Sequence, residues 1–264
     1  MKNKEQLEEK NGIQVPEDIK VKSLYKAVQL LFYFAEEDRE LGITELAEKS
    51  GLLKSSIYNM LSTYEACGLV KRNPLTNKYN LGIRVLELSS QFYRNNDVRH
   101  VVKPHMAEIA NCTGESVFLA VANGTEVIYL DGAFSSSSTG GRNMTGVTAP
   151  LYCTGIGKAM LAYAPEEAVN EVIAKGLLPF TQNTIINGEN LKNELIKIRE
   201  KGYSVDNMEH EYGIKCVAVP IRNAENQVVA ACSISGPSPR LGDDKLEELA
   251  GILKHHADMV QMML

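Results

Sequence analysis

Apolar residues recur at three- and four-residue intervals in the first part of the chain, which is the period of amphipathic helices. The pattern predicts helices over residues 23–36, 45–50 and 55–67, followed by short strands over residues 69–72 and 78–81. Thr44 is placed to cap the second helix, and the turn-forming residues 73–77 separate the two strands. Helix, helix, turn, helix and hairpin is the order of a winged helix-turn-helix.

Beyond residue 83 the pattern changes to helices mixed with strand-like segments. Helices are predicted over residues 83–96, 98–111, 156–163, 165–175 and 190–201 and from about residue 243, and strands over residues 116–121, 126–131, 214–222 and 228–235. Asn123-Gly124 is a strong signal for a tight hairpin, so an antiparallel sheet is expected. The serine- and glycine-rich residues 133–148 predict a long loop, which we interpret as a flexible connection in preference to a lid over a ligand.

Domain boundaries follow from these segments. Residues 1–20 are charged, lack periodicity and contain Pro16, which predicts a mobile tail. The sequence Asn-Asn-Asp at residues 95–97 resembles a break in the chain. We therefore expect a two-domain α+β protein, with a winged helix-turn-helix at residues 21–82 and a linker helix at residues 83–97. The second domain, an antiparallel sheet flanked by helices, is expected at residues 98–264.

The composition is that of a soluble globular protein, since 44% of the 264 residues are hydrophobic and 23% are charged. No apolar run approaches the roughly 18 residues that cross a bilayer, and the first residues do not begin a signal peptide, so we expect a cytoplasmic protein. Five scattered cysteines without a Cys-x-x-Cys pair indicate neither a disulfide framework nor a zinc ribbon.

The net charge of −5 conceals one basic block. Residues 50–84 contain five basic residues and one acidic residue, which indicates a surface for a polyanion, although a charge run is more often only a solvated face. The third predicted helix favours the interpretation as a polyanion-binding surface, because hydrogen-bonding or cationic side chains occupy its outward positions. These are Lys54, Ser55, Ser56, Tyr58, Asn59 and Ser62. Such side chains can contact base edges in the major groove, and the hairpin cations Lys71, Arg72 and Lys78 can contact phosphates.

Six segments carry more specific motifs, which lie in order along the chain. They are residues 43–52 (ITELAEKSGL) with 54–56 (KSS), 79–82 (YNLG), 154–162 (TGIGKAMLA), 202–206 (GYSVD), 213–218 (GIKCVA) and 233–237 (SISGP). In this order the segments resemble the IclR (isocitrate lyase regulator) family of bacterial transcription regulators, and the likeness covers about residues 21–264.

The resemblance implies a fold and a set of partners. The fold is a winged helix-turn-helix, a linking helix used in dimerisation, and a GAF-like C-terminal domain that binds a small effector. Such proteins bind double-stranded operator DNA as dimers or pairs of dimers, and they repress or activate genes for the catabolism of organic acids, sugar acids or aromatic acids. The alternative is a GAF-like sensor or dimerisation protein that does not read DNA. That alternative would need an acidic or apolar outer face on the third helix, which this sequence lacks.

The resemblance also implies the polar contacts of an effector pocket. These residues are Gly155, Ile156, Asp206, Cys216, Ser233 and Ser235. Residues 155–158, Gly-Ile-Gly-Lys, lead into a predicted helix, whose free backbone N–H groups can hold a carboxylate. The segment is not a nucleotide-binding P-loop, because Tyr152 and Ala159 stand where that motif requires Gly and Ser or Thr.

An enzyme is the competing class. Asp206, His210 and Cys216 are close in sequence and suggest a Cys-His-Asp hydrolase, but no nucleophile-elbow or oxyanion signature accompanies them, so we do not expect an enzyme. Cys153, His210 and Cys216 have no recognised metal-ligand spacing, so we expect neither a metal nor another cofactor.

Overall fold

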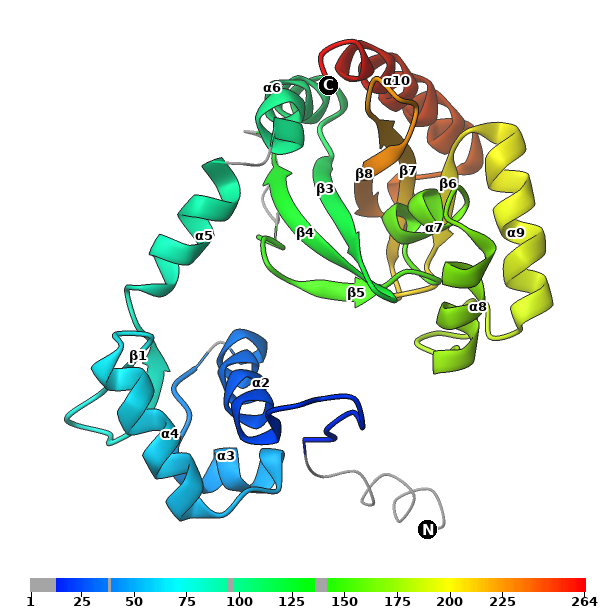
Figure 1. Cartoon of the computed structure of the whole chain (residues 1–264). Helices are drawn as coiled ribbons and strands as arrows, with labels where there is room; N and C mark the ends of the chain where they lie inside the picture. The colour runs from blue at the N-terminus through cyan, green and yellow to red at the C-terminus, as the bar shows by residue number, and fades with distance from the viewer. Residues whose placement is uncertain (1–12, 38, 95–96, 136–141) are drawn as a thin grey trace. The chain divides into compact units, whose positions relative to one another are not determined.

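The computed structural model describes residues 13–37, 39–94, 97–135 and 142–264. The chain divides between residues 95 and 96 into two compact units, each with a hydrophobic core of its own (Figure 1). Residues 1–12 of the predicted tail lie outside the described residues. Within the remainder of that tail, the Ile13 backbone N–H donates to the Ser50 carbonyl at 2.9 Å.

In the described residues of the N-terminal unit there are three packed helices, a two-stranded hairpin and one further helix. Its elements are α2 (Lys22–Glu36), α3 (Ile43–Ser50), α4 (Lys54–Ala66), β1 (Val70–Arg72), β2 (Tyr79–Leu81) and α5 (Val85–Arg94). Leu30 of α2, Leu46 of α3 and Leu61 of α4 are fully buried in one core. β1 and β2 pair antiparallel, and Leu41 forms a bridge to Tyr79 at their edge. The predicted helix-turn-helix with its hairpin is therefore confirmed.

Two glycines explain local details of this unit. α3 begins at Ile43 with Gly42 as its N-cap, so the prediction that Thr44 caps this helix is wrong. The Glu45 carboxylate accepts the Gly42 N–H at 2.8 Å, which satisfies the helix start without a hydroxyl cap. At the hairpin exit, a Cβ on Gly82 would lie 2.2 Å from the Gly68 carbonyl oxygen, so glycine alone fits this approach.

The C-terminal unit is a six-stranded antiparallel sheet with helices on both faces (Figure 1). Its helices are α6 (Asp97–Thr113), α7 (Gly155–Leu161), α8 (Glu166–Lys175), α9 (Gly188–Lys201) and α10 (Asp243–Gln261), with a 3-10 turn, η1 (Ser238–Arg240). Its strands are β3 (Ser116–Asn123), β4 (Glu126–Ala133), β5 (Thr148–Pro150), β6 (Ser204–Asn207), β7 (Ile214–Arg222) and β8 (Val228–Pro237). The strand order is β5-β4-β3-β8-β7-β6. α6 and α10 cover one face, and α7, α8 and α9 cover the other.

Successive side chains of β8 alternate between the two faces of the sheet. On β8, Cys232 and Ile234 belong to the core beneath α6 and α10. Ala231 belongs to the core beneath α7, so Ser233 and Ser235, two and four residues further, face the same side. Within the described chain, no helix is both long and apolar enough to cross a membrane.

Candidate functional site

α4 presents a polar face opposite its buried one. Its exposed side chains, spaced three or four residues apart along one face, are Ser55, Tyr58, Asn59 and Ser62. Ile57, Leu61 and Tyr64 are buried on the opposite face. Lys54 is exposed in the first turn, whereas Ser56 is half-buried at the margin between the two faces. The structure therefore brings five of the six predicted α4 residues to the surface and leaves Ser56 partly covered.

The three predicted hairpin cations have unequal surroundings. Lys71 is exposed. Arg72 donates from its guanidinium to the Asn77 side-chain oxygen at 2.9 Å. Lys78 is half-buried, and its ammonium lies 3.3 Å from a Glu45 carboxylate oxygen. A phosphate contact from Lys78 therefore requires the lysine to share or leave this ion pair.

Two acidic residues that the sequence did not single out organise the hairpin. Glu40 accepts hydrogen bonds from the side chains of Asn73 and Thr76, both at 2.7 Å. The Gly42 N–H, with further help from nearby cations, lowers the pKa of Glu45 to about 2. Both carboxylates thus act as fixed acceptors that hold the base of the hairpin at neutral pH.

Strand pairing in the C-terminal unit assembles the core of the predicted effector site. The register aligns Asp206 of β6 with Cys216 of β7, and Cys216 with Ser235 of β8. The Cys216 thiol donates to the Ser235 hydroxyl at 3.1 Å. Gly155 lies directly over this row, because an added Cβ there would be 3.4 Å from the Cys216 Cβ and 3.5 Å from the Asp206 nitrogen. Four residues from four separate segments are thereby brought together.

The start of α7 supplies backbone donors beside this row. Thr154 is the N-cap, and its hydroxyl accepts the Gly157 N–H at 3.1 Å. The N–H groups of Gly155 and Ile156 have no partner within the helix, as at any helix start. The Ile156 side chain is buried in the core beneath α7, so this residue can contact a ligand through its backbone alone.

Aromatic side chains extend the site toward β3 and β4. Ser233, which is buried, pairs in register with Phe118, whose ring centroid is 5.8 Å from that of Tyr129. Burial raises the pKa of Tyr129, and the nearby Cys216 and Asp206 act in the same direction. Tyr129, which the sequence did not single out, therefore keeps its proton at neutral pH and can donate a hydrogen bond.

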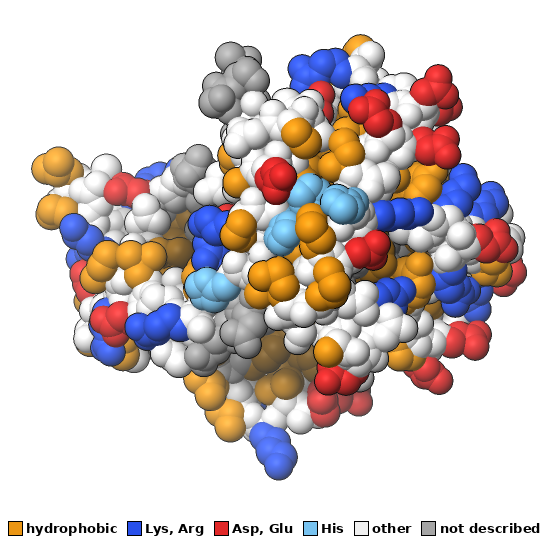
Figure 2. Space-filling view, turned by 90° about the horizontal axis from the view of Figure 1, so that it is seen from above, with side chains coloured by type: hydrophobic (Ala, Val, Ile, Leu, Met, Phe, Trp, Pro, Cys, Tyr) orange, Lys and Arg blue, Asp and Glu red, His pale blue; other side chains and the backbone are white. Residues whose placement is uncertain are grey.

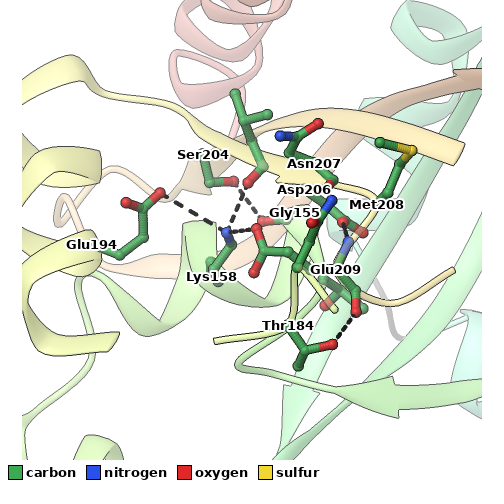
Figure 3. A network of polar contacts seen from close by, with 12 residues as sticks. Gly155, Lys158, Thr184, Glu194, Ser204, Asp206, Asn207, Met208 and Glu209 are labelled. Carbon is green, nitrogen blue, oxygen red and sulfur yellow. Dashed lines mark hydrogen bonds and ion pairs between the residues drawn. The ribbon is translucent and has the colours of Figure 1, made fainter. Parts of the chain in front are cut away.

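A buried charged network lies next to the same row (Figure 3). Lys158 of α7 is fully buried, and its ammonium donates to the Glu209 carboxylate and to the Val205 carbonyl, the latter at 2.7 Å. Glu194 lies 3.9 Å from the same ammonium. The Glu209 N–H in turn donates to the Asp206 carboxylate at 2.7 Å. The network thus connects the helix that begins at Gly155 to the predicted ligand-contacting carboxyl.

One sequence signal pointed to this network. Lys158 is the single charged residue in the apolar segment 156–162, and a cation in such a segment needs an anionic partner. Nothing local identifies Glu209 as that partner, because it lies 51 positions further along the chain. Glu209 Oε2 is buried and has no hydrogen-bond partner among the residues that the structure describes.

The protonation states of the Asp206, Cys216 and His210 side chains argue against nucleophilic catalysis. Burial raises the pKa of Asp206 to about 7 and also raises the pKa of the Cys216 thiol, so the sulfur stays neutral. The hydrogen-bond acceptor of that thiol is Ser235 and not His210. Burial lowers the pKa of His210, whose ring packs 5.1 Å from the ring of Phe180. A thiolate–imidazole pair, which a cysteine hydrolase needs, is absent from this described group.

A winged helix-turn-helix joined to an α+β domain with a buried polar site defines a class, the ligand-sensing transcription regulators. Family models match both parts: the IclR helix-turn-helix domain over residues 23–74, and the bacterial transcriptional regulator IclR C-terminal domain over residues 90–262. The chain therefore belongs to the IclR family of DNA-binding transcription regulators, and it is not an enzyme.

Individual relatives agree with this assignment. The HTH-type transcriptional regulator XynR of Escherichia coli (strain K12) is 32% identical over 227 residues, which cover 86% of this chain and 90% of the relative. The crystal structure of the Thermotoga maritima IclR is similar, with a TM-score of 0.71 and 34% identity over 92% of this chain and 98% of that one. An IclR homolog from Microbacterium hydrocarbonoxydans, complexed with 4-hydroxybenzoate, has a TM-score of 0.78 and 25% identity over 91% of this chain and 98% of its own.

Proposed function

We propose that this regulator reads its operator with the outer face of α4 and contacts the neighbouring phosphates with the β1–β2 hairpin. In this proposal the residues facing base edges are Ser55, Ser56, Tyr58, Asn59 and Ser62, and the phosphate contacts are Lys54, Lys71, Arg72 and Lys78. The observation that carries the proposal is the division of α4 into a buried apolar face and an exposed polar face with no acidic residue before Glu65. A helix of this composition fits the major groove.

We assign one proposed role to each of the three segments whose boundaries the sequence predicts. Residues 21–82 bind DNA, residues 83–97 serve self-association as a dimer or tetramer, and residues 98–264 bind the effector in a cytoplasmic protein. α5 supports the second role, because none of its residues is buried and it exposes Leu86, Leu88 and Phe92. An exposed apolar helix of this kind is typical of an interface. A two-fold dimer would place two α4 helices at half-sites about 34 Å apart or a multiple of that spacing.

The proposed effector is a small carboxylate, drawn from organic, sugar or aromatic acids. The N–H groups of Gly155 and Ile156 would hold the carboxylate, while Asp206, Cys216, Ser233 and Ser235 would contact its other polar groups. Tyr129 adds a hydroxyl donor to this set. The 4-hydroxybenzoate held by the similar Microbacterium protein supports an aromatic hydroxy acid as one member of the class. Effector binding would change DNA affinity by favouring one dimer geometry over another.

A mobility-shift assay tests the DNA-reading proposal. The full chain is titrated onto the DNA upstream of its own gene and onto a scrambled duplex of equal length, at two salt concentrations. We expect selective retention of the upstream DNA and weaker binding to both duplexes at the higher salt. Equal affinity for the two duplexes, repeated across fragments of the source genome, would contradict sequence reading by α4.

Calorimetry with a panel of small carboxylates tests the effector proposal. Asp206→Ala should weaken effector binding and leave operator binding without effector unchanged. Asp258→Ala, an exposed aspartate on α10, is the matched control and should change neither. If Asp206→Ala binds every carboxylate as the parent protein does, Asp206 does not belong to the site. Joint loss of effector and operator binding would show misfolding instead, which circular dichroism detects.

A further inference from the structure

Two histidines face each other between the first and the last helix of the C-terminal unit. His105 of α6 and His256 of α10 place their Nδ1 atoms 3.0 Å apart, with ring centroids at 5.3 Å. Glu108 lies one turn after His105 on α6, with its carboxylate beside the two imidazoles. One nitrogen from each histidine and one carboxylate oxygen of Glu108 all lie within 4.8 Å of one another. Figure 2 shows histidine side chains gathered on this face of the molecule. This face lies on the opposite side of the sheet from the proposed effector site.

His256 occupies a position where the helix pattern calls for an apolar residue. Leu249, Leu253 and Val260 on the same side of α10 are buried in the core, and His256 itself is 8% exposed. A buried polar ring needs a partner, and here the partner is the other imidazole. Since a hydrogen bond between two neutral imidazoles uses one ring hydrogen, the arrangement leaves both rings with facing nitrogens that can also serve as ligands.

The geometry points to a binding site for a divalent transition-metal ion, Zn²⁺ in the first place, formed by His105, Glu108 and His256. Two imidazoles and one carboxylate are an established donor set for zinc, with the fourth position left to water. Nitrogens bound at about 2.1 Å to a tetrahedral ion stand about 3.4 Å apart, so the present 3.0 Å needs a side-chain shift of a few tenths of an ångström. Mg²⁺ and Ca²⁺ prefer oxygen ligands throughout and fit this set poorly.

The surroundings allow an ion at this point. A cavity of about 10 Å³ lies between α6, α10 and the sheet. His105 and His256 line it together with apolar residues such as Val102 and Leu253, and Glu108 lies outside this lining. His105 and Glu108 are three residues apart on one helix, so both side chains project from the same face toward α10. On binding, each imidazole offers Nδ1 to the metal and carries its hydrogen on Nε2, so the ring that donates Nδ1–H in the metal-free pair changes tautomer.

A bound ion would tie α6 to α10 and thereby join the two ends of the C-terminal unit. Because the three ligands are brought together only in the folded state, binding stabilises that state by mass action. This role is separate from effector binding, which uses the other face of the sheet.

Calorimetric titration of Zn²⁺ into chelator-treated full-length protein tests the site. Exposed thiols such as those of Cys67 and Cys112 can also bind zinc, so every variant is made in a Cys67→Ser/Cys112→Ser background. We expect one Zn²⁺ per chain, and we expect His105→Asn and Glu108→Gln each to weaken binding about tenfold or more. The matched controls His100→Asn on α6 and Glu247→Gln on α10 should bind as the background does.

Thermal unfolding with and without Zn²⁺ gives an independent readout. The ion should raise Tm for the background and both controls, and raise it much less for His105→Asn and Glu108→Gln. Glu108 is exposed, so Glu108→Gln should keep the metal-free Tm, which separates ligand loss from misfolding. Absence of Zn²⁺ binding in the background, or equal affinity in all four variants, would overturn the site and leave His105 and His256 as a hydrogen-bonded packing pair.

Discussion

Two polar regions of this regulator, the outer face of α4 and the residues beneath α7, differ in how far solvent reaches them. The outer face of α4 exposes Ser55, Tyr58 and Asn59 to solvent, where each can be replaced with little effect on the fold. In the polar row beneath α7, Asp206 is buried and Cys216 and Ser235 are partly buried. The adjoining Lys158 and Glu209 are buried and pair over a long sequence separation. The first surface has donors and acceptors ready for an external partner, whereas most polar groups of the second already satisfy one another.

The difference shows how each surface depends on the rest of the chain. A DNA-reading face requires a helix that is buried on one side, and the periodicity of α4 provides this locally. A buried site requires every charge to meet its partner, since an unpaired charge in a low-dielectric interior is strongly destabilising. Substitutions in the two regions should therefore differ both in size and in the property that they change.

The largest effect is expected from Lys158→Met. This substitution leaves the Glu209 carboxylate buried without its cation and should lower the free energy of unfolding of the C-terminal unit by about 3–5 kcal/mol, as measured by urea denaturation. The double variant Lys158→Met/Glu209→Met should regain most of the loss, because an apolar pair replaces both charges. Lys197→Met, an exposed lysine on α9, is the control. A loss no larger than that of the control would contradict a coupled buried pair.

The second effect concerns the pH dependence of stability. The pKa of Asp206 is about 7 in the fold, against an ordinary value of 3.8. Between these two values the folded chain holds a proton that the unfolded chain has lost, so stability falls as pH rises from about 4 to about 7 and levels off above. Asp206→Asn removes this dependence and should be more stable than the parent by about 4 kcal/mol at pH 8, with a small difference at pH 4. Identical pH profiles of parent and variant in chemical denaturation would disprove the raised pKa.

A smaller and qualitatively different effect is expected from Asn59→Ala on α4. If Asn59 reads a base edge, the variant should lose discrimination between the operator and single-base variants of it by about 1–3 kcal/mol, while stability stays unchanged. Fluorescence anisotropy on a set of such duplexes measures the ratio. Asn170→Ala, an exposed asparagine on α8, should leave that ratio unchanged. Equal weakening on every duplex would remove Asn59 from base reading.

The smallest effect is expected from Arg72→Ala in the hairpin. A phosphate contact carries no sequence information, so binding should weaken alike on operator and scrambled DNA. The slope of log affinity against log salt should fall by about one unit, which titrations at four salt concentrations resolve. Arg199→Ala, an exposed arginine on α9, should leave the slope unchanged. A change in operator preference would instead assign a base contact to Arg72.

Most elements that the sequence predicted well have a long periodic pattern. The short strands β1 and β2 were also predicted, because the turn-forming residues 73–77 lie between them. α2, α4, α10 and the long strands β7 and β8 extend over nine or more residues, and their predicted bounds differ from the structure by two residues or fewer where both ends were predicted. β5 and β6 contain three and four residues, too few for a period of two to be visible, and they were not predicted. Their strand conformation depends on the hydrogen bonds that neighbouring strands offer.

The residues of the candidate effector site likewise fall into those that sequence motifs implied and those that no local pattern marked. The resemblance to a family implied Gly155, Asp206, Cys216 and Ser235 as pocket residues. The strand register aligns the last three, and Gly155 of α7 lies over them. Tyr129 and Glu209 were missed, because no local pattern marks a tyrosine or a glutamate as facing a site on another strand or helix.

The sequence by itself determined the family, the two units and the polar outer face of α4, because motifs and helical periodicity are properties of neighbouring residues. Tertiary structure alone decided that Lys158 meets Glu209, that the pKa of Asp206 rises to about 7, and that His105 faces His256. The physical reason is that burial and Coulomb interactions depend on distance in space, and the chain brings these groups together from positions 51 and 151 residues apart.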